Sequence, residues 1–415
     1  MTSSSLALIG CEACTPIERI RDALVIIESG KIAWAGPRGA VPPPAGAETV
    51  SLQGGLVCPG FIDLQVNGLG EDSLLAGDPE AVSRVARALA RRGTAAFLPT
   101  LTSDAPERLL AAAGAVRRAW ESRDGEGEPA AAILGLHLEG PYIAPKMRGA
   151  HPAAHVRPLD LGEIERIAEA AGGFGPEGRP GLRLLTLSPE VEGAPEAARR
   201  LTERGVVIAI GHTAAEEAQV QALLEAGARF AVHAFNRYAA PGAVPAPFHR
   251  APGPMAAVLS DPRLTAGLIA DGAHVHPQVA AAFLRARGWE RTALTSDLAS
   301  APSSPEPPSD AAAVRQEDAA VRREGVLAGS RLSLGEMLPL LREWTDLDPG
   351  RLIATATRNP ARLLGLSSRG LSPPRGLLAP GAAADLCVLA PATLELRAAM
   401  AGGRWSFGRE VIANQ

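Results

Sequence analysis

Aromatic residues and cysteines are scarce in this chain. Only 4% of its 415 residues are Phe, Trp or Tyr, but 46% are hydrophobic, so it can still bury a large core. The four cysteines, Cys11, Cys14, Cys58 and Cys387, are too few for a disulfide framework in a chain of this length. The first two have the spacing of half a zinc site or of a redox pair. No second Cys/His pair of zinc-finger spacing follows nearby, which favours reduced structural thiols.

A strong net charge and long apolar runs are also lacking. The formal net charge of −4 and a pI near 6.1 give no global basic field, so neither nucleic acid nor an anionic membrane is indicated as a partner. No uninterrupted apolar run approaches the roughly 20 residues of a transmembrane helix, and the first residues lack the order of a secretory signal. We therefore expect a cytoplasmic protein that acts on a small molecule.

The hydrophobic pattern changes near residue 56. Before it, short apolar segments and turns predict a small all-β structure. From Phe61 onward, apolar runs alternate with helical patterns, which predicts a parallel sheet. The expected strands begin at Phe61 and continue at residues 94–101, 131–138, 182–187, 206–210, 229–233, 265–270 and 292–296. Strand–helix units of this number over about 250 residues have the size of a (β/α)₈ barrel.

The tail interrupts this alternation. Residues 301–310 are dense in Pro and Ser and predict a flexible loop. Residues 334–347 and 349–364 predict two helices, the first capped by Ser333 with Glu336 three residues later.

Short strands are expected again at residues 376–389 and 400–412, where they would pair with the chain start. The sequence thus predicts an α/β fold. We expect a TIM-like (β/α)₈ barrel at residues 56–365 and a small β-sandwich domain built from residues 1–55 and 366–415.

Polar residues follow five of the expected strands. They are Glu139 in His137-Leu-Glu-Gly-Pro141, His212, His233, the segment Asp271-Gly-Ala-His274, and Asp297. Barrel enzymes carry their chemistry at the carboxyl ends of the strands, so we expect these groups to meet. Taken singly, each has an ordinary alternative: a carboxylate can cap a helix or loop, and a histidine can be a satisfied core residue.

Together these residue types suit metal-assisted hydrolysis. Glu139, His212 and His233 make a two-His, one-carboxylate set that fits Zn²⁺ or Fe²⁺ with a position left for water. Asp297 is then free to act as general base. His274 could polarise a carbonyl or hold a hydroxyl, whereas His249 and His276 are expected in exposed loops.

The motifs resemble those of the N-acetylglucosamine-6-phosphate deacetylases, a family of the amidohydrolase superfamily. The resemblance covers nearly the whole chain. Its matching segments are Pro59-Gly-Phe-Ile-Asp63, Gln65-Val-Asn-Gly68, His137 to Pro141, Arg148-Gly-Ala-His151, Leu187-Ser-Pro-Glu190, Gly211-His-Thr213, His233-Ala-Phe-Asn236, Ala270 to His274, Asp297, Leu327-Ala-Gly-Ser330 and residues 381–389.

This resemblance implies roles for individual residues. Glu139, His212 and His233 would bind one divalent transition metal, zinc or iron, with Asp297 as acid and base and His274 or the metal at the oxyanion. Gln65 and Asn67 stand where most of the superfamily has His-x-His, so they mark a vestigial second-metal position. The implied substrate contacts are Ala150, His151, Asn236, Arg237, Asp271, His274, Leu327, Ala328 and Gly329, with Arg250 on the phosphate from the same or a neighbouring subunit of a homodimer.

The implied reaction is hydrolysis of the acetamide of N-acetylglucosamine 6-phosphate to glucosamine 6-phosphate and acetate. Arg237 and Leu298 replace a small Ala that is usual in the family, which leaves the substrate open. The alternatives are deacetylation of N-acetylgalactosamine 6-phosphate, hydrolysis of another amide, and a catalytically silent barrel that only binds a sugar phosphate. The joint presence of three metal ligands and Asp297 argues against the silent barrel.

Overall fold

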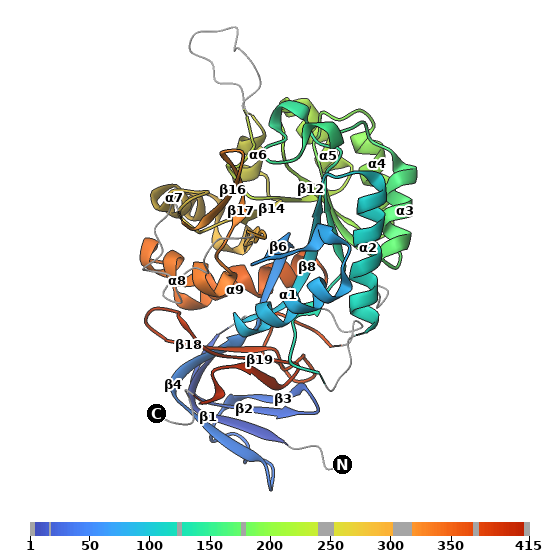
Figure 1. Cartoon of the computed structure of the whole chain (residues 1–415). Coiled ribbons are helices and arrows are strands. Elements are labelled where there is room, and N and C mark those ends of the chain that lie inside the picture. The colour runs from blue at the N-terminus through green and yellow to red at the C-terminus, as the bar shows by residue number, and fades with distance from the viewer. Residues whose placement is uncertain are drawn as a thin grey trace.

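The computed structural model describes residues 5–15, 18–122, 127–175, 180–239, 253–301, 318–367 and 373–410. A barrel surrounded by helices lies against a curved β-sheet near which both termini are found (Figure 1). The predicted α/β architecture, with a barrel and a smaller β part built from both chain ends, is confirmed.

Within the described residues, eight parallel strands follow one another around the barrel in chain order. The ring is closed by a parallel bridge between Val66 and Leu298. The strands are β5 (Phe61–Val66), β8 (Thr94–Thr102), β10 (Leu136–Glu139), β11 (Leu182–Leu187), β12 (Val207–Ile210), β13 (Ala228–Ala231), β14 (Thr265–Leu268) and β15 (Thr292–Leu294). They are almost wholly buried, which is why each reads as an unbroken apolar run.

The strand expected at residues 131–138 is divided into β9 (Ala132–Ile133) and β10. Gly135 lies between them at a φ of 136°, and a Cβ atom there would stand 2.1 Å from Cγ of Arg183. The close approach of this side chain requires glycine and interrupts the strand.

Helices cover the outside of the barrel (Figure 1). They are α1 (Pro79–Arg91), α2 (Pro106–Glu121), α3 (Leu161–Ala171), α4 (Ala194–Glu203), α5 (Glu217–Glu225), α6 (Pro254–Ser260), α7 (Pro277–Arg287), α8 (Leu334–Trp344), α9 (Pro349–Ala356) and α10 (Arg358–Leu363). The capping box of α8 is confirmed, since Glu336 Oε2 accepts the backbone N–H of Ser333 at 2.8 Å. The single helix expected at 349–364 is wrong: it breaks at Thr357, three residues before Pro360, which lacks the N–H that would continue it.

The two chain ends form one mixed sheet of seven described strands, in the order β20-β19-β18-β4-β1-β2-β3. These are β1 (Leu6–Cys14), β2 (Arg19–Glu28), β3 (Lys31–Pro37), β4 (Glu48–Pro59), β18 (Leu386–Leu389), β19 (Leu396–Ala401) and β20 (Arg404–Phe407). β4 joins the two ends because it pairs parallel with β1 and antiparallel with β18. The sheet curves around an aliphatic core that includes Leu8, Val25, Val57, Leu386 and Met400.

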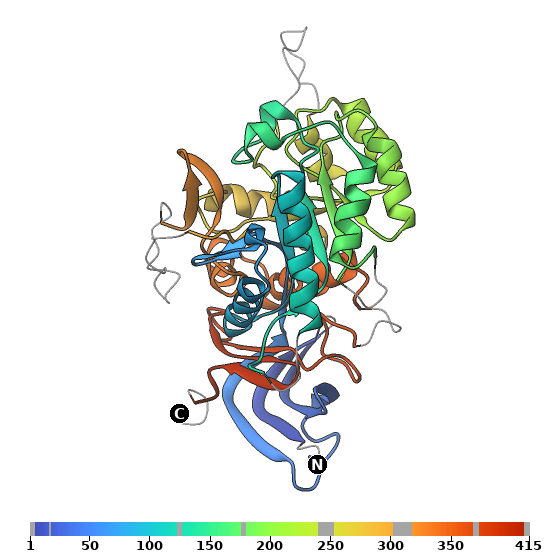
Figure 2. The same cartoon turned by 45° about the vertical axis from the view of Figure 1, so that its right-hand side comes forward.

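Two hairpins lie near the carboxyl end of the barrel: β6 (Gly68–Leu69) with β7 (Asp72–Ser73), and β16 (Ala320–Arg323) with β17 (Val326–Ser330). Figure 2 shows the second in orange at the side of the barrel. The loop expected at 301–310 lies, apart from Ala301, outside the described residues. None of the described helices is long and apolar enough to cross a membrane.

Candidate active site

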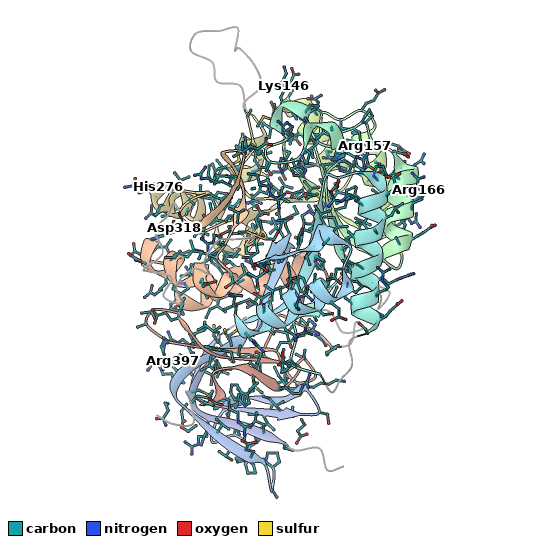
Figure 3. The ribbon with its side chains drawn as sticks, viewed as in Figure 1. Lys146, Arg157, Arg166, His276, Asp318 and Arg397 are labelled. Carbon is teal, nitrogen blue, oxygen red and sulfur yellow. The ribbon has the colours of Figure 1, made fainter. Side chains whose placement is uncertain are left out.

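The polar groups expected at the strand ends lie at one mouth of the barrel. Glu139 is the last residue of β10, and His212 and His233 follow β12 and β13 by two residues. The loop after β10 crosses the end of the barrel away from the sheet, as Lys146 at the top of Figure 3 shows. Glu139, His212, His233, His274 and Asp297 share the lining of one pocket of about 330 Å³.

Glu139 is the centre of a compact donor cluster. Its Oε1 lies 2.9 Å from Nε2 of His233 and 3.3 Å from Nε2 of His212, and the two Nε2 atoms are 3.2 Å apart. These separations match the edges of a tetrahedral zinc site, roughly 3.3 Å for ligand bonds of about 2.0 Å. The three residues are no more than 5% exposed. The cluster therefore has the size, chemistry and dryness of a transition-metal site.

The outer nitrogens of the two rings are held by the backbone. Nδ1 of His212 lies 3.0 Å from the carbonyl oxygen of Met147, and Nδ1 of His233 lies 3.2 Å from that of Asn236. A carbonyl oxygen only accepts, so both Nδ1 atoms carry hydrogen and the neutral rings have their lone pairs on Nε2. Metal-bound histidines are usually oriented in this way.

His151 also lies at the cluster, but its Nδ1 accepts a hydrogen bond where those of His212 and His233 donate one. Glu139, His151 and His212 offer ligand atoms that all lie within 4.8 Å of one another. However, the backbone N–H of Ser103 donates to Nδ1 of His151 at 3.2 Å, so a neutral ring carries its hydrogen on Nε2. Burial lowers the pKa of His151 to about 3, which keeps the ring neutral. This geometry favours His151 as a hydrogen-bond donor to a ligand and not as a metal ligand.

Two buried amides hold the two carboxylates of the site. Nε2 of Gln65 donates to Oε1 of Glu139 at 2.9 Å, and Nδ2 of Asn67 donates to Oδ1 of Asp297 at 2.7 Å. Both amide oxygens are buried without a hydrogen-bond partner among the described residues. Gln65 and Asn67 thus orient the two carboxylates.

Asp297 stands in an environment that favours proton transfer. Burial, with added repulsion from Glu139, raises the pKa of Asp297 to about 6, although His233, His274 and the bond from Asn67 act in the other direction. Its φ of 51° is a left-handed conformation, so the backbone here is shaped to direct the side chain.

Asp63, in β5, holds the segments that carry Gln65 and Asp297. The residue is fully buried and accepts hydrogen bonds from the backbone N–H (3.1 Å) and hydroxyl of Ser296 and from the N–H of Gln65. Burial raises the pKa of Asp63 to about 7. By tying β5 to the segment after β15, Asp63 sets the spacing of Asn67 and Asp297. A carboxylate inside an apolar strand was the available signal in the sequence.

His274 is oriented by its neighbour Asp271. Nδ1 of His274 lies 2.7 Å from Oδ2 of Asp271, whose Oδ1 accepts the backbone N–H groups of Ala273 and His274. This leaves Nε2 of His274 for a ligand. Asp271 does not line the pocket, so its contribution is to hold His274.

The remaining expected contacts that line the pocket are Ala150, His151, Asn236, Arg237, Leu327, Ala328 and Gly329. Arg250 and His249 lie outside the described residues, and His276 is exposed.

The pocket also contains residues that no sequence motif marks. Thr102, Met147, Tyr238 and Arg323 line it as well. Arg323 belongs to the β16–β17 hairpin, which was not predicted from the sequence.

The sequence profile of the amidohydrolase family matches residues 56–405. The chain belongs to the amidohydrolase family. Among amidohydrolases, it is 34% identical to the N-acetylgalactosamine-6-phosphate deacetylase of Escherichia coli O157:H7 over 80% of this chain and 83% of that one. It is 28% identical to the N-acetylglucosamine-6-phosphate deacetylase of Bacillus subtilis (strain 168) over 93% of each chain.

A solved amidohydrolase structure has the same architecture. It is a mutant of the N-acetyl-D-glucosamine-6-phosphate deacetylase of Mycobacterium smegmatis in complex with N-acetyl-D-glucosamine-6-phosphate. The TM-score is 0.81 at 29% identity, covering 97% of this chain and 100% of that chain. The chain is therefore an amidohydrolase of the sugar-phosphate deacetylase type, with a buried His/Glu cluster of the kind that holds metal in this family.

Proposed function

We propose that this amidohydrolase removes the acetyl group of N-acetylglucosamine 6-phosphate, forming glucosamine 6-phosphate and acetate. The observation that carries the proposal is Asp297, which shares one pocket with the Glu139 cluster and has a pKa raised to about 6. A carboxylate with such a pKa can both accept and return a proton near neutral pH.

Glu139, His212 and His233 would hold one divalent transition metal, zinc or iron, because their Nε2 and Oε1 atoms converge at ligand spacing. Such an ion would supply Lewis acidity to the acetyl carbonyl and to a water molecule. Gln65 and Asn67 direct N–H groups, which cannot ligate, at the two carboxylates. This supports a single ion per chain.

The residues of the chain would manage the protons and the orientation of the substrate. Asp297 would take a proton from the attacking water and return it to the departing amine, using Oδ2 because Oδ1 accepts from Asn67. His274, oriented by Asp271, would contact the acyl oxygen. The Nε2–H of His151 would donate to an oxygen of the sugar. Arg250 would bind the phosphate from the same or a neighbouring subunit of a homodimer.

N-acetylgalactosamine 6-phosphate is the second candidate substrate. It is favoured by the 34% identity to a deacetylase named for this sugar, against 28% for the Bacillus relative. The two sugars differ only in the configuration of one hydroxyl group, and the metal and Asp297 would act on either in the same way.

The test is acetate release from the two N-acetylhexosamine 6-phosphates and from their unphosphorylated forms, with metal content measured on the same preparation. We expect about one metal per chain and a clear preference for a phosphorylated sugar. Metal-loaded protein that releases acetate from none of the four would overturn the proposal, and two tightly held metals would show that Gln65 and Asn67 do not exclude a second ion.

A further inference from the structure

The active-site pocket is lined by both acidic and basic side chains. Glu139, 3% exposed, and Asp297 line it where the barrel strands end. The arginines that line the same pocket are Arg237, which is half-buried, and Arg323, which is exposed. For a molecule that carries an anionic group and an uncharged amide, charge complementarity favours placing the anion beside the arginines and not beside the carboxylates.

Among the described residues, no carboxylate forms an ion pair with Arg237 or Arg323. Some arginines elsewhere are paired with a carboxylate, as Arg84 is with Asp72 and Arg157 with Glu163. Two unpaired guanidinium groups on one pocket provide an anion site ready for use.

The chain makes room for Arg237 at Gly149. A Cβ atom on Gly149 would lie 2.8 Å from Nε of Arg237 and 3.4 Å from its Cγ and Cδ atoms. Gly149 also has a φ of 63°, which disfavours a side chain. The absence of a side chain at Gly149 thus lets the Arg237 side chain pack against its backbone at the pocket wall.

A hairpin with a tight turn presents Arg323. The turn between β16 and β17 has φ values of 50° at Glu324 and 78° at Gly325, as in the tight two-residue turns that match the twist of the strands. The same hairpin carries Leu327 and Gly329, which line the pocket too. The same hairpin that forms part of the pocket wall therefore positions the backbone of Arg323.

We propose that Arg323, together with Arg237, binds the phosphate of the substrate from within the same chain, and that Arg323 is a specificity-determining residue. The inference rests on the proposed deacetylase function. Each planar guanidinium can bind two phosphate oxygens, and the two groups together balance a dianion. Binding energy from this end of the substrate positions the acetamide beside Asp297.

The experiment compares kcat/KM for the phosphorylated and unphosphorylated N-acetylhexosamine in wild type, Arg323→Ala, Arg237→Ala and Arg322→Ala. Arg322 is the matched control: it is the neighbour of Arg323 and exposed, donates from Nη1 to the carbonyl of Gly325 at 3.4 Å, and does not line the pocket. We expect Arg323→Ala to lower kcat/KM for the phosphorylated sugar by roughly 10- to 100-fold, as for a lost hydrogen bond to a charged group, and to leave the plain sugar unchanged. Arg323→Lys should recover part of the loss.

An equal fall for both sugars would mean that Arg323 supports the hairpin and not the phosphate, and an unchanged preference would overturn its role. If wild type deacetylates neither sugar, the proposed function fails, and inorganic phosphate titrated into the metal-loaded protein decides the anion site separately. Weaker phosphate binding in Arg323→Ala than in Arg322→Ala would support that site, and equal binding would overturn it.

Discussion

Three histidines converge on Glu139, but their hydrogen bonds give them different capacities. His212 and His233 donate from Nδ1 to carbonyl oxygens, whereas His151 accepts at Nδ1 from the N–H of Ser103. We therefore predict that His212→Ala loses its metal after dialysis, while His151→Ala keeps about one ion per chain and loses substrate affinity. Elemental analysis of both variants is the measurement. Loss of metal from His151→Ala to the same degree would make His151 a ligand.

Asp297 is predicted to carry both proton transfers. Asp297→Asn keeps a side chain of the same shape, so metal content and substrate binding should persist while kcat falls by roughly 10²- to 10⁴-fold. Single-turnover acetate release measures this, with metal content as the control. Turnover near that of wild type would remove Asp297 from the mechanism.

The same carboxylate predicts the pH dependence. Asp297 must be ionised to accept a proton, so kcat/KM should fall as the pH drops through its pKa of about 6. A bound cation stabilises the ionised form and can only move this acidic limb to lower pH. A pH profile of kcat/KM is the check, and a limb centred above pH 7 would contradict the assignment.

At this scale the sequence was informative wherever chemistry required a particular residue type. Glu139, His212, His233 and Asp297 could be selected because polar groups that directly follow apolar strands are unusual. Arg323 could not, since an exposed arginine in a short hairpin looks like any solvated surface residue. The tautomers of the histidines depend on partners such as Ser103, which is distant in sequence.

Among the elements, the β16–β17 hairpin packs against the backbone of Asp297. A Cβ atom on Gly329 would lie 2.5 Å from the backbone oxygen of Asp297, whereas at Gly325 the space is open. Both glycines have positive φ values, so replacing either by alanine costs stability. We predict that Gly329→Ala lowers kcat more than tenfold, because it displaces the Asp297 backbone, and that Gly325→Ala lowers the melting temperature but leaves kcat unchanged. Equal kcat values in the two variants would show that this contact is unimportant.

The barrel elements were predictable for a simple reason. Strands buried on both faces need unbroken apolar runs, and helices over them need a single apolar face, so both patterns are visible in the sequence. The breaks within the expected strand at 131–138 and the expected helix at 349–364 were not predictable. They depend on local details, which are the Arg183 side chain beside Gly135 and the missing N–H of Pro360. Helix α3 was missed although Asp160 caps it and Ile164 and Ile167 mark its buried face, signals that the sequence does contain.

In the whole molecule, the terminal sheet and the barrel share one core. Leu56, Phe61, Cys387 and Leu389 pack in the same cluster as the apolar face of α8, and Sγ of Cys387 donates to the carbonyl oxygen of Gly93 at 3.2 Å. In Figure 1, β18 and β19 lie between the barrel and the first strands of the sheet. The last strands therefore complete the sheet and also cover the base of the barrel.

A chain that ends before Leu386 should consequently fail to fold as a barrel. Each large apolar side chain that it leaves uncovered, such as Leu56 or Phe61, forfeits about 1.5–3 kcal/mol of burial, and a few of these equal the roughly 5–15 kcal/mol that stabilises a typical domain. The control is a chain that ends after Phe407, which retains every strand of the sheet but loses the ion pair between Arg409 and Glu48. Thermal unfolding followed by circular dichroism should show one cooperative transition for the control and none for the shorter chain. A shorter chain with a cooperative transition, bound metal and acetate release would establish that the barrel is stable without the sheet.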